Sequence, residues 1–371
     1  MLIGVPTEIK KNEHRVGLVP GSVRELVHHG HKVLVQSEAG KGAGFTNEDY
    51  QEVGAKIANT PEDIFAKADM IVKVKEPQPK ECKMLREGQI LFTYLHLAPD
   101  PTQTELLLES GCIAIAYETV TDNHGGLPLL APMSEVAGRI SVQAGARCLE
   151  KSAGGRGVLL GGVPGVAAAH VVVIGGGVVG TNAIRMAMGL EAQVTVIDKS
   201  LHRLNELDLQ FATKLNTIYS TQDAIEKYVA HADLVIGAVL VPGAAAPKLI
   251  TKDMIKEMRE GTVMVDVAID QGGSCETSHP TTHQDPTYVV DGVVHYCVAN
   301  MPGAVPRTSA FALNNATLPF VISLADLGYK SAMLRDKHLL NGLNVYKGRI
   351  TCEPVAIALV KNYTPLEEVL I

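Results

Sequence analysis

The sequence has no tryptophan, and phenylalanine and tyrosine together make up only 4% of its residues. It also has no polybasic run. Its 33 Lys and Arg are scattered among 40 Asp and Glu, and the formal net charge is -7. A chain that is acidic overall lacks the electrostatic footprint of a nucleic-acid-binding protein. We therefore expect no nucleic-acid partner.

Long hydrophobic runs are missing as well. The apolar residues 166–180 form a short stretch that glycine interrupts, whereas a membrane-spanning helix needs about 20 consecutive apolar residues. Residues 1–6 look like a strand and lack the basic region of a signal peptide. We therefore expect no membrane segment and, without an export signal, a cytoplasmic location.

The cysteines show neither a CxxC pair nor a zinc-like spacing to histidine. This pattern argues against a structural zinc site and predicts thiols buried in the core. The six residues are Cys82, Cys112, Cys148, Cys275, Cys297 and Cys352.

Glycine is abundant, with 35 residues, and 46% of the 371 residues are hydrophobic. This length is too great for one ordinary core and suggests two domains. Apolar segments of strand length alternate with amphipathic helical segments, which predicts an α/β fold with mainly parallel sheets and helices on both faces. In the first part we expect strands at residues 2–5, 32–35, 71–75, 90–94 and 113–117.

A break at residues 122–126 separates this part from a second alternating region. The region begins with a long helix predicted from Ser134 to about Lys151, in which Ser134 has the side chain of a good N-cap. A glycine-rich stretch, residues 154–165, follows the helix. The second region then continues to about Pro306.

A buried strand at residues 169–174 runs directly into a GxGxxG motif formed by Gly175, Gly177 and Gly180. In a dinucleotide site the first glycine permits the tight turn, the second lets the pyrophosphate approach the backbone, and the third lets helix and strand pack closely. The helix that follows would present free N–H groups and a partial positive charge to the phosphates. The alternative is a glycine turn with a purely structural role.

Asp198 strengthens the dinucleotide interpretation, because it ends the next predicted strand about 20 residues after the motif. A carboxylate at this position accepts hydrogen bonds from the ribose hydroxyls and repels a 2′-phosphate, which favours NAD over NADP. Arg203 lies nearby and could weaken that preference.

NAD implies hydride transfer, so the protein must also bind a substrate and manage one proton. Arg15, Lys75 and His96 each follow a predicted parallel strand, so their side chains should meet where ligands bind to such sheets. Asp270 follows a strand of the second region. Histidine is well suited to proton transfer near neutral pH. Each residue also has a structural alternative: a solvated loop arginine, an exposed strand end, a packed histidine and a turn carboxylate.

Several longer motifs resemble the family of alanine dehydrogenases and transhydrogenase NAD-binding subunits, nearly from end to end of the chain. They are more specific than GxGxxG. These segments are residues 5–8, 15–20, 72–77, 92–98, 132–139, 160–166, 270–273 and 299–303, together with the glycine loop.

The resemblance implies an NAD-dependent L-alanine dehydrogenase, which interconverts L-alanine with pyruvate and ammonia. Arg15 and Lys75 would then bind the substrate carboxylate, and His96 and Asp270 would be the acid/base pair. The NAD site would contain Ser134, Gly175, Gly177, Val178, Val179, Gly180, Asp198, Arg203, Ser220, Val239, Leu240, Val267, Ala268, Ile269, Asp270, Val298, Ala299, Asn300 and Met301.

The resemblance also implies a domain order. A Rossmann-type NAD domain, residues 131–305, would be inserted into a discontinuous substrate domain formed by residues 1–130 and 306–371. Both would be doubly wound parallel-sheet domains. A homohexamer is expected. Some relatives carry a metal near the positions of Ser323 and Leu327, but these two side chains do not suit a Glu/His site, so no metal is expected here.

Three other interpretations remain open at this stage. A transhydrogenase NAD-binding subunit would pass hydride to a second nucleotide and would not need a substrate acid/base pair. A saccharopine dehydrogenase-like enzyme would need a more open pocket for its longer substrate. A non-catalytic NAD-binding protein is disfavoured by the set of polar residues at the predicted strand ends.

Overall fold

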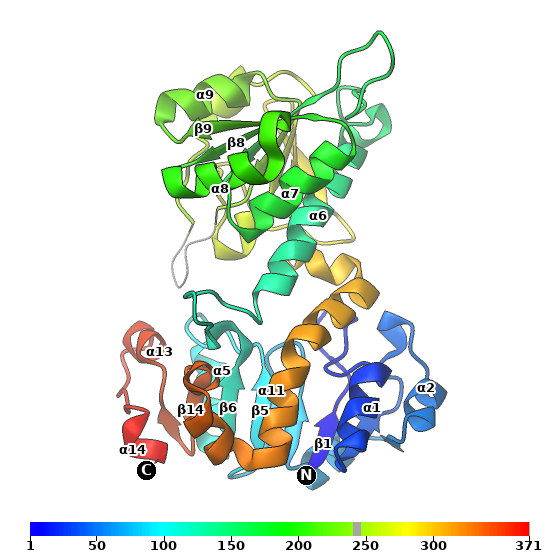
Figure 1. Cartoon of the computed structure of the whole chain (residues 1–371), viewed down its shortest axis with the longest axis vertical. Coiled ribbons are helices and arrows are strands. Elements are labelled where there is room, and N and C mark those ends of the chain that lie inside the picture. The colour runs from blue at the N-terminus through cyan, green and yellow to red at the C-terminus, as the bar shows by residue number, and fades with distance from the viewer. Residues whose placement is uncertain (240–245, 371) are drawn as a thin grey trace. The chain divides into compact units, whose positions relative to one another are not determined.

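The computed structural model describes residues 1–239 and 246–370 (Figure 1). It divides into two compact units. Unit 1 comprises Met1–Met133 and Val305–Ile371, and unit 2 comprises Ser134–Ala304. Unit 1 therefore contains both ends of the chain. Each unit contains one sheet with helices packed against it, which confirms the expected α/β fold with two mostly parallel sheets.

The sheet of unit 1 has the strand order β15-β14-β6-β5-β4-β1-β2-β3. All neighbours are parallel except for β14, which is antiparallel to both β6 and β15. The strands are β1 (Leu2–Val5), β2 (Lys32–Gln36), β3 (Lys56–Ala58), β4 (Met70–Val72), β5 (Ile90–Thr93), β6 (Ile113–Ala116), β14 (Leu343–Tyr346) and β15 (Arg349–Ile350).

Helices pack on the unit 1 sheet, and α1 and α11 lie together in front of it in Figure 1. Ile71, Leu91 and Ala114 from three neighbouring strands share a buried core with residues of α3, α5 and α13. The helices of unit 1 are α1 (Pro20–His28), α2 (Asn47–Glu52), α3 (Pro61–Lys67), α4 (Pro79–Cys82), α5 (Pro101–Ser110), α11 (Pro306–Arg335), α12 (Lys337–Leu340), α13 (Glu353–Ala358) and α14 (Glu367–Leu370).

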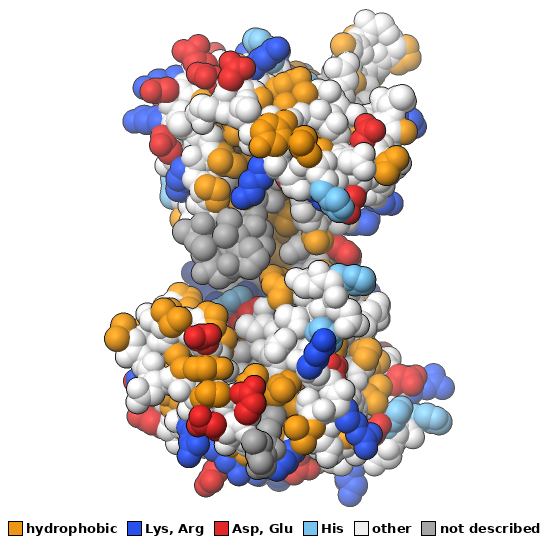
Figure 2. All heavy atoms as spheres, turned by 60° about the vertical axis from the view of Figure 1, so that its left-hand side comes forward, with side chains coloured by type: hydrophobic (Ala, Val, Ile, Leu, Met, Phe, Trp, Pro, Cys, Tyr) orange, Lys and Arg blue, Asp and Glu red, His pale blue; other side chains and the backbone are white. Residues whose placement is uncertain are grey.

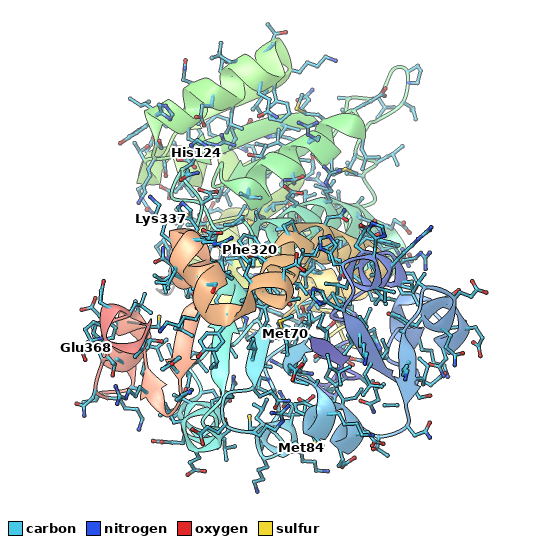
Figure 3. All side chains as sticks on the ribbon, turned by 60° about the horizontal axis from the view of Figure 1, so that its bottom comes forward. Met70, Met84, His124, Phe320, Lys337 and Glu368 are labelled. Carbon is cyan, nitrogen blue, oxygen red and sulfur yellow. The ribbon has the colours of Figure 1, made fainter. Side chains whose placement is uncertain are left out.

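Local capping explains where these helices begin and end. Asp100 accepts a hydrogen bond from the backbone N–H of Gln103 at the start of α5, and Gly111 ends the helix in the left-handed conformation, with φ +66°. At α12, the ring nitrogens of His338 form hydrogen bonds with Thr121 and Asn123, which lie in the segment that follows β6. Figure 3 shows the neighbouring His124 and Lys337 at this place.

Helix α11 is long and apolar enough to cross a membrane by length and composition alone, although no segment of this kind was predicted from the sequence. Its most apolar window is 39% buried. Asn314 is buried, and its side-chain oxygen accepts a hydrogen bond from the backbone N–H of Val19 at 2.8 Å. Gly328, with φ +73°, also kinks the helix. These contacts make α11 a core helix of unit 1.

The sheet of unit 2 has the order β12-β13-β11-β10-β7-β8-β9, and only β12 is antiparallel. Its strands are β7 (His170–Ile174), β8 (Gln193–Asp198), β9 (Leu215–Tyr219), β10 (Leu234–Gly237), β11 (Val263–Asp266), β12 (Thr287–Val290) and β13 (Val293–Tyr296). Its helices are α7 (Val178–Gly189), α8 (Leu201–Phe211), α9 (Gln222–Ala230) and α10 (Lys252–Glu257). Helix α6 (Ala131–Cys148) contributes to both units.

Two local predictions were wrong. Ser134 is not an N-cap, because α6 already begins at Ala131 and Ser134 lies inside its first turns. The strand expected at residues 71–75 ends at Val72, although Lys73 and Val74 still form single backbone hydrogen bonds to Phe92 and Tyr94. Beyond Val72 the backbone N–H groups of Val74 and Lys75 donate to the buried carboxylate of Glu8.

All six cysteines are free thiols, and all but Cys352 are buried, as expected for core residues. On the surface seen in Figure 2, acidic and basic side chains are interspersed. A narrow arm, residues 157–168, extends from unit 2 (Figure 1) and turns through Gly162 and Gly165 at positive φ. Its apolar side chains Leu159, Val163 and Val166 are exposed.

Candidate active site

Arg15 lies in the loop after β1 and is only 2% exposed. Its guanidinium donates to both carboxylate oxygens of Glu13, from Nε at 2.6 Å and from Nη2 at 2.5 Å. Nη1 donates to the thioether sulfur Sδ of Met133 at 2.9 Å. Burial alone would raise the pKa of Glu13, but the hydrogen bonds and charge of Arg15, with a further contribution from Lys75, lower it to about 2. The pair is therefore fully ionised near neutral pH.

Lys75 follows β4 and is partly buried. Its backbone is fixed by Glu8, whose carboxylate accepts hydrogen bonds from the N–H groups of Val74 at 2.7 Å and Lys75 at 3.3 Å. The same carboxylate lies 3.2 Å from the ammonium of Lys73, which also lies 2.8 Å from Glu81. Lys73 is completely buried. This buried ion cluster therefore holds the segment that carries Lys75.

The two carboxylates of this cluster share one cation. Burial would lower the pKa of Lys73, but Glu8 and Glu81 outweigh it and raise the pKa. Burial also raises the pKa of Glu8. The positive charge of Lys73 lowers this pKa and the negative charge of Glu81 raises it, and the net result is a raised pKa. The lysine is thus held in its charged form.

His96 follows β5 by three residues, and its side chain is 43% exposed. Its ring stacks on the ring of Tyr94, with the centroids 5.9 Å apart and the planes 9° from parallel. Tyr94 is buried, and its hydroxyl donates to the backbone oxygen of Leu129 at 2.5 Å. Burial raises the pKa of Tyr94, and the nearby charge of Arg15 opposes that increase.

The structure therefore brings Arg15, Lys75 and His96 together within unit 1. Strands β1, β4 and β5 are parallel neighbours, and each of the three residues follows one of them. The charge of Lys75 helps to lower the pKa of Glu13, the carboxylate that binds Arg15. The charge of Arg15 in turn opposes the raised pKa of Tyr94, and the ring of Tyr94 stacks on that of His96. Two cations and a half-exposed imidazole at one sheet edge suit a small carboxylate-bearing substrate.

The glycine loop of unit 2 has the geometry that its motif predicts. Gly175 has φ +101°, and a Cβ atom on Gly180 would lie 1.8 Å from the oxygen of Gly175, so helix α7 packs directly against the turn. A Cβ on Gly177 would meet nothing within 4 Å, which leaves this side of the backbone open to a ligand. Gly177 is also the N-cap residue of α7, which starts with Val178 and Val179. These features fit a bound dinucleotide pyrophosphate.

Asp198 ends β8, and both of its carboxylate oxygens accept backbone hydrogen bonds, from Gly176 and from Ser200. Arg203 lies beside it and donates to the backbone oxygen of Gly176 at 2.7 Å and to Thr181 at 2.6 Å. It also pairs with Glu206. The arginine is thus bound to the glycine loop itself.

The other residues expected to bind NAD lie mostly after strands of unit 2. Ser220 follows β9, Val239 follows β10, and the short turn η5 (Val267–Gln271) follows β11 and contains Val267, Ala268, Ile269 and Asp270. Val298, Ala299, Asn300 and Met301 follow β13, with Asn300 at φ +60°. Ser134 lies on α6. Leu240 is outside the residues that the structure describes.

Asp270 is exposed at the surface of unit 2, and its Oδ1 lies 3.4 Å from the backbone nitrogen of Asn300. The loop that carries it is organised by Asp266, which is completely buried. The carboxylate of Asp266 accepts hydrogen bonds from the backbone and hydroxyl of Ser274 and from the hydroxyl of Ser278. Asp266 therefore acts as the anchor of the 267–278 segment.

Sequence reasoning did not identify the residues that support these side chains. Glu8, Glu13, Lys73, Tyr94, Glu118 and Asp266 contact or hold the expected site residues. Glu8, Glu13, Lys73 and Tyr94 lie within or beside the longer motifs, which was their only sequence signal, whereas Glu118 lies outside all of these motifs. Among residues 1–239 and 246–370, no group of three or more His, Cys, Asp or Glu has an arrangement that could hold a metal ion.

Comparisons with known proteins agree across the whole chain. The sequence family described as "Alanine dehydrogenase/PNT, N-terminal domain" matches residues 4–137, and "Alanine dehydrogenase/PNT, C-terminal domain" matches residues 141–353. An alanine dehydrogenase from Halomonas elongata is 60% identical over 363 residues, which cover 98% of each chain.

Two solved structures are similar in fold. An L-alanine dehydrogenase superposes with a TM-score of 0.94 at 53% identity, covering 97% of this chain and 99% of the other. A transhydrogenase from Sinorhizobium meliloti has a TM-score of 0.82 at 23% identity, covering 95% and 99%. The second likeness concerns the fold alone.

Proposed function

The chain belongs to the alanine dehydrogenase/PNT family, and from this premise we propose that it is an NAD-dependent L-alanine dehydrogenase. It oxidises L-alanine to pyruvate and ammonia and catalyses the reverse reductive amination. The family and the NAD cofactor expected from the motifs are confirmed. The observation that carries the proposal for the site is the grouping of Arg15, Lys75 and His96 after three neighbouring strands of unit 1.

In this proposal the substrate carboxylate binds to the positive charges of Arg15 and Lys75. Glu13 holds the guanidinium by two hydrogen bonds, and Glu8 holds the backbone of Lys75, so both cations are positioned before the substrate arrives. Preorganised charges act on the bound substrate without a reorganisation cost during the reaction.

His96 is the proposed base for the oxidation. The substrate amine must be neutral when the hydride leaves Cα, so His96 accepts a proton from the amine, directly or through water. NAD, when bound by the glycine loop and Asp198, supplies the hydride acceptor. Loss of the hydride and the proton converts alanine into iminopyruvate, and water then adds to the imine carbon and ammonia leaves.

Asp270 is the second proposed acid/base group, for the hydrolysis of the imine. It lies on the same segment as several residues expected to bind NAD, and Asp266 holds that segment through buried hydrogen bonds. A carboxylate at this place can steer the protons of the attacking water and of the departing amine.

A steady-state assay tests the activity. Purified protein with L-alanine and NAD should produce NADH and pyruvate, and pyruvate with ammonia and NADH should give alanine. A transhydrogenase subunit would instead transfer hydride only between nucleotides, and a saccharopine dehydrogenase-like enzyme would need a longer substrate. Absence of alanine-dependent NADH formation would reject the proposal.

We also propose a homohexamer in the cytoplasm. The assembly has physical support in the exposed apolar side chains of the arm at residues 157–168, of which Leu159 is 66% and Val166 63% exposed. Exposed apolar groups of this kind are typical of contact surfaces. Light scattering of the purified protein tests the assembly, and fractionation of the source cells tests the compartment.

A further inference from the structure

The backbone of His96 is held in an uncommon conformation. Its φ is +49°, in the left-handed region that residues other than glycine rarely adopt. Such a conformation is strained for a residue that has a Cβ atom, and it persists only when neighbouring groups hold it. The groups that bind the backbone of His96 therefore help to determine where its imidazole lies.

Glu118 is the group that holds this segment. Its carboxylate accepts a hydrogen bond from the backbone N–H of His96 at 2.6 Å and from that of Leu95 at 3.1 Å. It belongs to the short turn η2 (Tyr117–Thr119), directly after β6. Because β6 pairs with β5, the carboxylate reaches the segment that follows β5 from the neighbouring strand.

The same carboxylate also faces the imidazole. Nδ1 of His96 lies 3.9 Å from Oε1 of Glu118. The imidazole ring also stacks on the ring of Tyr94, which limits its orientation. The Glu118 side chain is only 17% exposed, so water screens its charge less than at the open surface. A negative charge beside Nδ1 favours a proton on that nitrogen and leaves Nε2 as the acceptor.

We propose that Glu118 is a positioning residue for His96, an inference that rests on the proposed function. Glu118 fixes the backbone that carries the imidazole and directs Nε2 toward the substrate amine. When Nε2 accepts the amine proton, the ring becomes an imidazolium, and the ionised Glu118 stabilises its positive charge. Glu118 itself neither gains nor loses a proton.

The experiment compares three variants of the complete enzyme. Glu118→Gln keeps an oxygen that can accept the two backbone hydrogen bonds but removes the charge. Glu118→Ala removes both functions. Glu109→Gln is the matched control, because Glu109 is exposed on α5 and makes the same change of charge.

We expect Glu118→Gln to lower kcat for alanine oxidation about tenfold and Glu118→Ala about a hundredfold, the range of a positioned acid/base. The KM for NAD and the melting temperature of Glu118→Gln should stay at the control values. In a His96→Ala background, Glu118→Ala should cost little further activity, because its role acts through the imidazole. A solvent deuterium isotope effect on kcat should rise in Glu118→Gln.

Three results would overturn the inference: a kcat for Glu118→Gln within twofold of the control, an unchanged solvent isotope effect, or a full and additive loss from Glu118→Ala in the His96→Ala background. Glu118→Gln carries the test if Glu118→Ala does not fold. If the unmodified enzyme forms no NADH from alanine, the proposed function fails first, so the two failures are distinguishable.

Discussion

Asp198 accepts a hydrogen bond from the backbone N–H of Gly176, with its Oδ2 2.7 Å from the nitrogen. The residue expected to select the cofactor therefore also holds the glycine loop in place. A carboxylate oxygen has two lone pairs, so each oxygen can accept a ribose hydroxyl in addition to its backbone partner. Arg203 donates to the backbone oxygen of the same Gly176, so two side chains hold this residue of the glycine loop.

Two substitutions of Asp198 separate these roles. Asp198→Asn keeps an acceptor for Gly176 but removes the repulsion of a 2′-phosphate, so the ratio of kcat/KM for NADP to that for NAD should rise about tenfold. Asp198→Ala should raise this ratio and also raise the KM for NAD, because the loop loses its anchor. Cofactor titrations at fixed alanine measure both effects. An unchanged NAD/NADP selectivity in both variants would count against the ribose role.

Much of this arrangement could be predicted from sequence because it depends on local pattern. Alternating apolar segments indicated the parallel strands, and Arg15, Lys75 and His96 each follow such a strand, so their meeting at one sheet edge follows from topology. The glycine motif likewise predicted the tight turn between β7 and α7, because Gly175 adopts a positive φ and Gly180 lets the helix pack against the turn.

The supporting residues were not predictable in this way. Lys73, in the alternating run Val72-Lys73-Val74-Lys75, has the pattern of an exposed strand position. It is nevertheless completely buried, because it pairs with Glu8, which comes from a distant part of the chain, and with Glu81, which lies on the helix that follows. Glu118 binds a backbone group 22 residues away, which no periodicity reveals.

His96 should be essential for turnover but not for cofactor binding. We expect His96→Ala to lower kcat for alanine oxidation by about a hundredfold or more, because the amine loses its proton acceptor. The dissociation constant of NADH, measured from its fluorescence, should stay unchanged, since the glycine loop lies in the other unit. His202→Ala, a substitution of an 85% exposed histidine side chain on α8, is the control. Turnover close to that of the control would show that His96 has no role in proton transfer.

Asp270→Asn tests the second acid/base group with almost no change of shape. The amide can still interact with the backbone nitrogen of Asn300, but it cannot take up a proton. Steady-state kcat should fall by about a hundredfold or more in both directions while NADH still binds. Asp208→Asn, at an exposed position on α8, provides the charge-matched control. If Asp270→Asn keeps the activity of that control, the proposed role is wrong.

The buried ion cluster leads to a prediction about stability and pH. Lys73→Met leaves Glu8 and Glu81 buried without their cation, which should destabilise the fold by about 3–5 kcal/mol near pH 8. A carboxyl group whose pKa is raised on folding, as that of Glu8 is, favours the folded state at low pH and disfavours it as the pH rises through the raised value.

The destabilisation caused by Lys73→Met should therefore shrink as the pH falls from 8 toward 5, because Glu8, whose pKa is raised by burial, takes up a proton within the fold. Melting curves at both pH values, followed by circular dichroism, measure the effect. Lys67→Met removes the exposed pair with Asp63 instead and should change the melting temperature little at either pH. Equal destabilisation by Lys73→Met at both pH values would contradict this account of the cluster.

The arm at residues 157–168 should be a contact between subunits. Val163 is 54% exposed beside Gly162 and Gly165, whose positive φ angles shape the turn, so an isolated subunit would leave this apolar side chain in water. Val163→Asp places a charge there and should convert the proposed hexamer into smaller assemblies without unfolding unit 2, because the side chain lies outside its core. Val289→Asp, at a 61% exposed valine on β12, is the control and should stay hexameric. Light scattering after gel filtration gives the masses. A hexamer of unchanged stability in Val163→Asp would exclude the arm from the assembly.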